Sequence, residues 1–160
     1  MVNKQLSEKE ALIKLTALCS RAEHCSGEML DKMRKWEIPE NVQARIMAYL
    51  TENKYIDDTR FCHAFILDKI RYNKWGRRKV EQALWQKHVP NDIYTPILND
   101  IDDEEYLRVL RPLLKSKRKS TKAASEYELN TKLFRFAMSR GFTVDIIRQC
   151  LDTDDDPEDI

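Results

Sequence analysis

An internal repeat constrains the fold of this chain more than any other feature of its sequence. The segment WEIPENVQARIMAYL at residues 36–50 aligns with KHVPNDIYTPILNDI at residues 87–101 and with RGFTVDIIRQCL at residues 140–151. The aligned positions are Pro39, Pro90 and Thr143, then Val42, Ile93 and Ile146, and finally Ile46, Ile97 and Cys150. A period of about 50 residues is typical of arrays in which one supersecondary unit is repeated and neighbouring units share their apolar faces.

Apolar residues upstream of each copy recur at helical spacing and align as well. The equivalent positions are Met29, Val80 and Leu133 and, one turn later, Met33, Leu84 and Ala137. The chain contains only 3 Gly and 5 Pro, too few for the tight turns of a sandwich or barrel. We therefore predict an all-α fold of three tandem three-helix repeats that form an elongated, curved helical array.

The repeat boundaries are placed where the helical pattern restarts. The predicted parts are repeat 1 at residues 1–53, repeat 2 at residues 54–101, repeat 3 at residues 102–151 and an acidic C-terminal tail at residues 152–160. The first helices of the repeats are predicted at residues 8–21, 57–72 and 102–115. Residues 115–122 are rich in Lys, Ser and Thr, and we expect them to form a mobile polar connector within the third repeat.

Polar residues mark the predicted helix starts. Ser7 followed by Glu10 has the pattern of a capping box, and Ser26 and Asp57 are each predicted to cap a helix. The adjacent Asp57 and Asp58 also raise the alternative of a hydrolytic carboxylate pair. Consecutive helix residues point about 100° apart, so two such carboxylates do not converge on one reacting atom, which favours the cap.

Other chemistries find little support in the sequence. The cysteines Cys19, Cys25, Cys62 and Cys150 have no CxxC spacing, so burial explains them better than a zinc site does. There is no nucleophile elbow and no Gly-rich phosphate loop. No apolar run approaches the roughly 20 residues that a membrane span needs. We predict a cytoplasmic protein that is not an enzyme and uses no cofactor or metal.

Charge is segregated along the chain although the formal net charge is only +1. Residues 108–122 carry seven basic residues and no acidic one, whereas residues 152–160 carry six acids. Basic blocks attract phosphate backbones or acidic protein surfaces. An acidic tail can compete for such blocks or stay solvated, and the solvated tail is the interpretation that we favour.

Two basic clusters supply the candidate binding residues. They are Arg71, Lys74, Arg77, Arg78 and Lys79 in the second repeat, and Lys115, Lys117, Arg118 and Lys119 in the third. Basic residues next to Tyr72 and Trp75 are typical of nucleic-acid binding. The competing interpretation is that exposed helix faces carry Lys and Arg in any case, with Trp85 half-buried next to Leu84.

One block of the sequence resembles the RecX family of bacterial recombination regulators. The block reads LTENKYIDDTRFCHAFILDKI, followed by WGRRKVEQALWQKHVP. The positions that match the family pattern are Tyr55, Ile56, Asp57, Asp58, Arg60, Phe61, Gly76, Val80, Leu84, Lys87 and Val89. Lys54 and His88 stand where the family usually has Gly, just past predicted helix ends, where a left-handed backbone is favoured.

The resemblance implies three tandem three-helix repeats and a regulator of the RecA recombinase. Such a protein would lodge in the groove of the RecA–DNA filament and inhibit strand exchange, ATP hydrolysis and coprotease activity. The implied partners are the RecA filament and, through it, DNA. A groove binder has no need to self-associate, so we expect a monomer. The alternatives are a stand-alone DNA-binding helical module and a general helical-repeat scaffold for other proteins.

Overall fold

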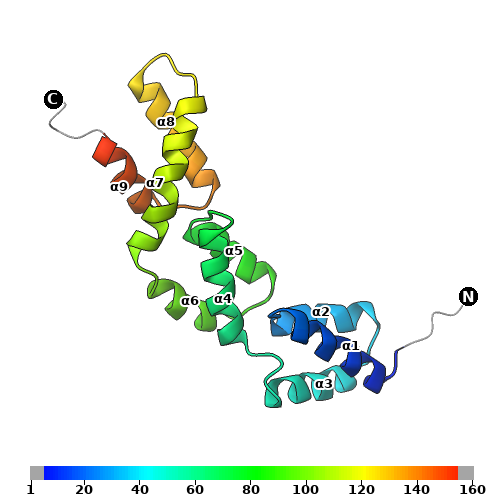
Figure 1. The fold of residues 1–160 in the computed structure, drawn as a ribbon. Coiled ribbons are helices and arrows are strands. Elements are labelled where there is room, and N and C mark those ends of the chain that lie inside the picture. Colours follow the sequence, from blue (N-terminus) through cyan, green and yellow to red (C-terminus); the bar gives the residue numbers. More distant parts are fainter. Residues whose placement is uncertain (1–5, 155–160) are drawn as a thin grey trace, which may run out of the picture. The chain divides into compact units, whose positions relative to one another are not determined.

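The computed structural model describes residues 6–154, and in this part of the chain it consists of nine α-helices without a strand (Figure 1). The helices are α1 Glu8–Arg21, α2 Ser26–Lys35, α3 Glu40–Glu52, α4 Asp58–Arg71, α5 Arg77–Gln86, α6 Asn91–Asn99, α7 Asp103–Ser120, α8 Glu126–Ser139 and α9 Val144–Asp154. They follow one another as three triplets, which confirms the predicted all-α fold of three-helix repeats. The predicted acidic tail lies outside the described residues, except for the last turn of α9.

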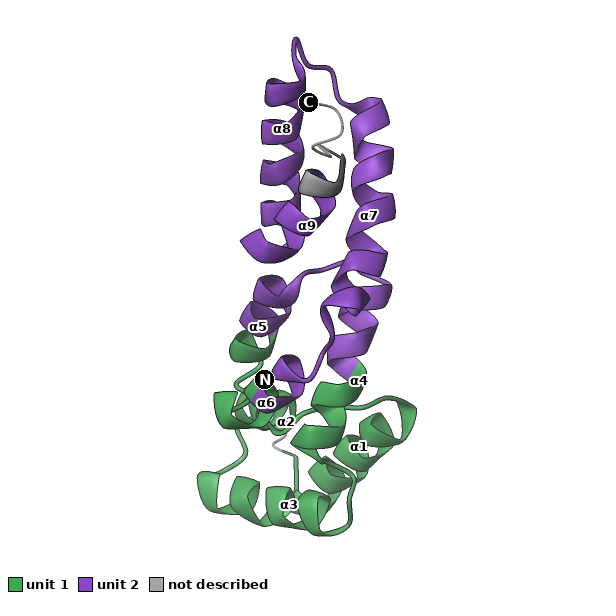
Figure 2. Cartoon of the chain, turned by 90° about the vertical axis from the view of Figure 1, so that its left-hand side faces the viewer, with its two compact units in different colours: residues 1–64, 84–95 green, residues 65–83, 96–160 purple. Residues whose placement is uncertain are grey.

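The helices belong to two compact units, which Figure 2 shows in different colours. Met1–Ala64 and Leu84–Thr95 form the first unit, and Phe65–Ala83 and Pro96–Ile160 form the second. The boundary passes through α4, α5 and α6, so each of these helices contributes to both units. The middle triplet is therefore not a compact unit of its own, and the exact limits of the repeats remain a prediction.

The core of the first unit is built from the helix faces that the repeat pattern predicts. Met29 and Met33 of α2 are fully buried, as is Leu84 at the corresponding position of α5. The residues clustered around the α2 pair are Ala11, Leu15, Ile38, Ile46, Leu50 and Ile56. The apolar spacing of the sequence thus identifies the buried stripe of each helix correctly.

The core of the second unit forms where α7 packs on α8 and α9. The predicted positions Val80, Leu133 and Ala137 are fully buried. Other buried side chains of this unit include Ile66, Ile70, Leu98, Leu107, Leu110, Leu114, Phe142, Ile146 and Ile147. The same stripe is therefore buried in all three triplets, although the residues that fill it differ.

The turn after the middle helix of each triplet has the same backbone geometry. Its residue with positive φ is Glu37 (56°), His88 (61°) or Gly141 (91°). The next residue donates its N–H back to the helix, in the pairs Ile38 to Met33 (3.0 Å), Val89 to Leu84 (3.1 Å) and Phe142 to Ala137 (3.2 Å). This bond satisfies a carbonyl at the helix end, as in a Schellman motif. The left-handed residue predicted at His88 is confirmed, and so is that at Lys54, whose φ is 59°.

Two local predictions were wrong. Helix α7 continues to Ser120, so residues 115–120 are helical and do not belong to a connector. Leu114, directly before this stretch, is buried. The basic residues of the last turn, Lys117, Arg118 and Lys119, are stabilised by the negative end of the helix dipole. Helix α2 is capped by Cys25, and Ser26 is its first helical residue.

Candidate partner-binding surface

The start of α5 is held against the turn that follows α8. Gly76 donates its N–H to the carbonyl oxygen of Arg140 at 2.9 Å, and Arg78 donates to that of Gly141 at 2.9 Å. A Cβ atom on Gly76 would lie 2.3 Å from the backbone of Phe142, so only glycine fits. This docking brings the first predicted basic cluster next to Arg140, a residue outside both clusters.

Trp75, in the turn before α5, lies beneath two ammonium groups. The Nζ atom of Lys79 is 5.0 Å from the centre of the indole ring, and that of Lys69 is 5.6 Å away. A cation this close to an aromatic face is attracted by the ring quadrupole. The ring therefore holds two lysines in defined positions next to each other.

Phe136 of α8 lies beneath two further cations. The Nζ atom of Lys117 is 4.9 Å from the ring centre, and the guanidinium carbon of Arg140 is 5.4 Å from it. Arg140 also donates a hydrogen bond to the carbonyl oxygen of Asn73 at 3.4 Å. Phe136 and Arg140 thus connect the basic end of α7 to the turn that carries Trp75.

We refer to the residues of these contacts as the cation–aromatic array. It consists of Lys69, Trp75, Lys79, Lys117, Phe136 and Arg140, all within the second compact unit. The array links the two predicted clusters, of which the first contacts α7 near its start, through Arg71, and the second lies at its end. Glu105, the partner of Arg71, precedes Lys117 by about 18 Å along the helix axis at the usual rise per residue.

Three of the nine predicted binding residues already pair with side chains of the same unit. Arg71 binds Glu105 through two nitrogens, with a shortest distance of 2.9 Å. Arg77 binds Glu81 at 2.9 Å and Asn99 at 2.8 Å. Arg118 binds Glu126 at 3.2 Å and Asn130 at 3.3 Å. The hydrogen bond from Arg71 lowers the pKa of Glu105, so this carboxylate stays charged. These arginines thus have structural roles within the fold.

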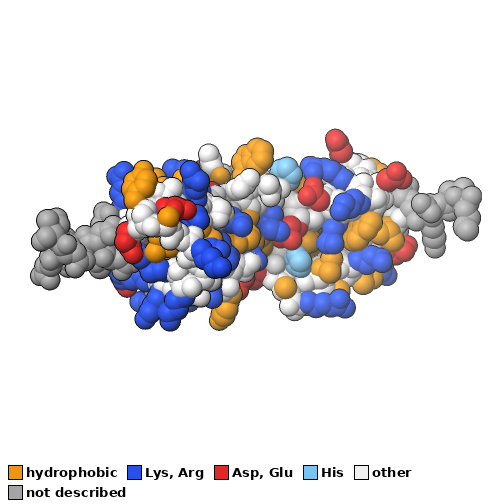
Figure 3. Space-filling view, turned by 90° about the horizontal axis from the view of Figure 1, so that it is seen from above, with side chains coloured by type: hydrophobic (Ala, Val, Ile, Leu, Met, Phe, Trp, Pro, Cys, Tyr) orange, Lys and Arg blue, Asp and Glu red, His pale blue; other side chains and the backbone are white. Residues whose placement is uncertain are grey.

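Four other predicted residues are exposed and have no ion pair within residues 6–154. They are Lys74, Arg78, Lys115 and Lys119. Lys74 lies in the turn between α4 and α5 with a positive φ of 59°. The face drawn in Figure 3 carries several groups of Lys and Arg side chains, with hydrophobic and acidic side chains between them. Their charges are available to an external anionic group.

The aromatic side chains of Tyr72 and Trp85 are exposed. Tyr72 is 79% exposed at the end of α4, next to Arg71. Trp85 is 70% exposed, so the expectation that it is half-buried was wrong. It follows Leu84 in the sequence, but the two side chains lie on different faces of α5, and only Leu84 reaches the core.

Sequence reasoning missed three members of the array, namely Lys69, Phe136 and Arg140. Lys69 also lies 5.3 Å from the ring centre of Phe65, four residues earlier in α4, and this spacing could have identified it. Phe136 approaches Lys117 because α8 packs on α7, and Arg140 approaches Asn73 because the start of α5 docks on the turn after α8. No local pattern in the sequence reports that docking.

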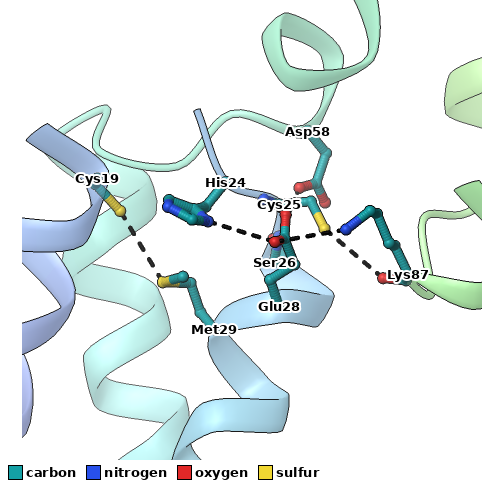
Figure 4. A network of polar contacts seen from close by, with 8 residues as sticks. All are labelled: Cys19, His24, Cys25, Ser26, Glu28, Met29, Asp58 and Lys87. Carbon is teal, nitrogen blue, oxygen red and sulfur yellow. Dashed lines mark hydrogen bonds and ion pairs between the residues drawn. The ribbon is translucent and has the colours of Figure 1, made fainter. Parts of the chain in front are cut away.

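Two of the four cysteines, Cys19 and Cys25, lie with His24 at a polar junction of the first unit (Figure 4). The Cys25 thiol donates to the carbonyl oxygen of Lys87 at 3.7 Å, and Glu28 pairs with His24 at 3.4 Å and with Lys87 at 3.6 Å. Burial raises the pKa of the Cys25 thiol to about 12. Within residues 6–154, no three His, Cys, Asp or Glu side chains are grouped to hold a metal ion.

The two adjacent aspartates have separate structural roles. Asp57 accepts a hydrogen bond from the backbone N–H of Arg60 at 3.0 Å, which confirms the predicted helix cap. Asp58 accepts one from the backbone N–H of Ser26 at 2.8 Å and so fixes the start of α2. Both carboxylates are used as acceptors for helix N-termini, which is not the arrangement of a hydrolytic pair. No helix within residues 6–154 has the length and apolar character to cross a membrane.

Two family models match this chain. The model described as RecX, second three-helix domain, matches residues 57–95. The model described as RecX, third three-helix domain, matches residues 103–151. The second match includes α7, α8 and most of α9, and the first includes α4, α5 and the start of α6. The array residues all lie inside the two matched ranges.

Proteins named Regulatory protein RecX are similar to this chain in sequence. One from Clostridium perfringens (strain SM101 / Type A) is 32% identical over 120 residues, which cover 74% of this chain and 56% of the relative. One from Acinetobacter baylyi is 29% identical over 136 residues, which cover 84% of this chain and 82% of the relative. The chain thus spans little more than half the length of the Clostridium perfringens protein.

Two solved structures have a similar fold. A crystal structure of RecX from Lactobacillus salivarius superposes with a TM-score of 0.81 at 18% identity and covers 91% of this chain and 95% of that one. A second structure, described as regulatory protein RecX, has a TM-score of 0.78 at 17% identity and covers 95% of this chain and 82% of the other. At these identities the likeness concerns the fold.

Proposed function

This chain belongs to the RecX family, and on that premise we propose that it is a regulatory protein that binds the RecA–DNA filament and inhibits RecA. The family resemblance implies inhibition of strand exchange, ATP hydrolysis and coprotease activity. The relatives described above carry the name of a regulatory protein. The proposed action is binding to the filament, without catalysis by this chain.

The observation that carries this proposal is the cation–aromatic array. Four cations held over two rings form a preorganised basic surface, because each ring fixes the position of the charges above it. Phosphates of DNA, or acidic side chains of a recombinase, would bind such a surface without first having to order it. The exposed Lys74, Arg78, Lys115 and Lys119 extend the positive charge on either side.

The exposed aromatic residues add a second type of contact. Trp75 and Phe136 are covered by cations, so their faces are not free to stack on bases. Tyr72 is 79% exposed beside the array and has a free ring face. A base from single-stranded DNA in the filament, or an apolar side chain of the recombinase, would pack against it.

The test is DNA-dependent ATP hydrolysis by the cognate recombinase, with this protein titrated in at fixed salt. We expect inhibition by the native chain and weaker inhibition by the triple variant Lys115→Gln, Lys117→Gln, Lys119→Gln. The matched control is Lys9→Gln, Lys14→Gln, Lys35→Gln, which removes the same charge from exposed positions of α1 and α2. No inhibition at severalfold excess of the native chain would contradict the proposal.

DNA binding without the recombinase separates the proposal from a stand-alone DNA-binding module. A salt-sensitive complex with DNA alone, together with unchanged ATP hydrolysis, would favour the stand-alone module. Inhibition that persists under salt conditions where DNA alone is not bound would favour action on the filament.

A further inference from the structure

A pocket of about 350 Å³ lies in the second unit, where the start of α5, the turn between α6 and α7 and the turn between α8 and α9 meet, and no residue of the array lines it. Its polar lining includes Arg77, Asn99, Asp103, Tyr106 and Asp145. These residues come from four helices, α5, α6, α7 and α9. Nothing in the proposed filament binding through the array requires this pocket.

Tyr106 is the unusual member of the lining. Only 5% of the residue is exposed, and its hydroxyl is buried without a hydrogen-bond partner among residues 6–154. Burial raises the pKa of Tyr106 to about 12, so the phenol stays neutral at physiological pH. An unpaired buried hydroxyl costs free energy relative to one in water, and native proteins have few of them. The geometry therefore leaves one polar group in this pocket unused by the fold.

The charges around the pocket determine which ligand could use that group. Arg77 is the cation of the lining, and Glu81 at 2.9 Å and Asn99 at 2.8 Å already occupy two of its nitrogens. Asp103 accepts a hydrogen bond from Gln149 at 3.4 Å. Asp145 is exposed and has no ion pair among the described residues. Two carboxylates therefore face one guanidinium that is already neutralised by Glu81.

An anion fits this arrangement poorly. The N-termini of α7 and α9 lie at the pocket, and Asp103 and Asp145 occupy their first turns, where carboxylates offset the positive end of the helix dipole. A bound anion would be placed against both carboxylates. A cation would be attracted by them and could donate a hydrogen bond to the phenol oxygen.

We propose that this pocket binds the guanidinium group of an arginine side chain from a protein partner, with Tyr106 as hydrogen-bond acceptor and Asp103 and Asp145 as counter-charges. Guanidinium is suited to this task because it has five N–H donors in a fixed plane and can contact separate acceptors at once. The proposed site is acidic and binds arginine. The cation–aromatic array of the same protein is basic. Its ligand chemistry does not depend on the identity of the partner that the array binds.

The probe is N-acetyl-arginine amide, titrated into the ¹⁵N-labelled full chain and followed by the amide shifts of Asn99, Asp103 and Asp145. N-acetyl-citrulline amide is the control, because it has nearly the same shape without the charge. Saturable shifts with the arginine probe and none with the citrulline probe are expected. Equal shifts with both probes would overturn the proposal, and so would no saturable shift with either, which would indicate a pocket that holds only solvent.

Variants assign the binding to the named groups. Asp145→Asn is expected to raise the dissociation constant of the arginine probe by about tenfold, because the probe loses a charged hydrogen-bond partner. Asp92→Asn is the matched control, since Asp92 is also exposed in the first turn of a helix but lies outside the pocket. An equal loss in both variants would contradict the site.

Tyr106→Phe distinguishes a ligand role from a structural one. The hydroxyl has no partner in the fold, so its removal should leave the melting temperature unchanged or slightly raised while the arginine probe binds severalfold more weakly. A lowered melting temperature with unchanged probe binding would show that the hydroxyl serves the fold, and would overturn its assignment as acceptor.

Discussion

The backbone N–H of Gly76 donates to the carbonyl oxygen of Arg140 at 2.9 Å and so joins the start of α5 to the end of α8. One repeat earlier, the corresponding residues are Cys25 and Lys87, and the Cys25 thiol donates to the Lys87 carbonyl at 3.7 Å. The chain has 3 glycines, and Gly27, Gly76 and Gly141 all lie at these two junctions. Each junction therefore joins the start of a middle helix to the turn after the middle helix of the next triplet. The two backbones approach so closely that a Cβ atom on the glycine would not fit.

Gly76→Ala should destabilise the protein by about 2–3 kcal/mol, because the added methyl would lie 2.3 Å from the backbone of Phe142 and the junction would have to open. Urea unfolding measures the change. Gln82→Ala, at an exposed position in the middle of α5, is the control and should be nearly neutral. A loss below about 0.5 kcal/mol for Gly76→Ala would show that the junction can relax.

Lys54→Gly and His88→Gly should each stabilise the protein by about 0.5–1 kcal/mol. Both residues have φ near 60°, a conformation that glycine adopts without the strain of a Cβ atom. Thermal or urea unfolding shows whether each substitution raises or lowers the free energy of unfolding. Lys14→Gly, at an exposed site within α1, should have the opposite effect and cost about 1 kcal/mol. Destabilisation by Lys54→Gly would mean that its side chain contributes more than the strain costs.

Stability should fall in acid partly through Glu28. Burial alone would raise the pKa of Glu28, but the hydrogen bond from the Cys25 N–H and the charge of Lys87 hold that pKa below the ordinary 4.5. A carboxyl with a lowered folded-state pKa contributes stability above its unfolded pKa and loses it as pH falls through the folded value. Unfolding free energies should therefore drop below about pH 4.5.

Glu28→Gln should flatten that acid dependence while lowering stability at neutral pH. Glu52→Gln is the control, because Glu52 is exposed and has no ion pair among the described residues. Urea titrations between pH 7 and pH 3 compare the three proteins. An unchanged slope below pH 4.5 in Glu28→Gln would assign the acid sensitivity to other groups.

The buried thiols should be protected from alkylation in the folded protein. Burial raises the pKa of Cys25 to about 12 and that of Cys62 to about 11, so little thiolate forms at pH 8. Cys19 is only partly buried and should react first. Labelling with iodoacetamide, located by mass spectrometry with and without urea, tests this order. Rapid modification of Cys25 without urea would contradict the junction in Figure 4.

The regular parts of the fold follow from local patterns in the sequence. Helical spacing predicts equivalent core positions for Met29, Val80 and Leu133, and all three are fully buried. The sequence predicts Ser7 and Asp57 as helix caps, and both accept the expected backbone hydrogen bond. These features depend on residues within one or two helical turns, which is the range over which periodicity and capping act.

The rest depends on contacts between distant segments. Arg140 approaches Asn73 only because the start of α5 docks on the turn after α8, and no local pattern encodes this pairing. The length of α7 was underestimated because a run of Lys and Ser looks like a connector. Leu114 packs in the core and Arg118 binds Glu126 of α8, and these contacts extend the helix to Ser120.

The most direct test of the proposed function is inhibition of RecA-catalysed ATP hydrolysis by the double variant Lys79→Gln, Arg140→Gln. Each residue contributes a cation to a different ring of the array, so we expect inhibition to weaken by about tenfold or more, with the helical spectrum unchanged. Lys14→Gln, Arg21→Gln removes the same charge from exposed sites of α1 and should inhibit like the native chain. Full inhibition by the array variant would contradict the proposal that this surface binds the filament.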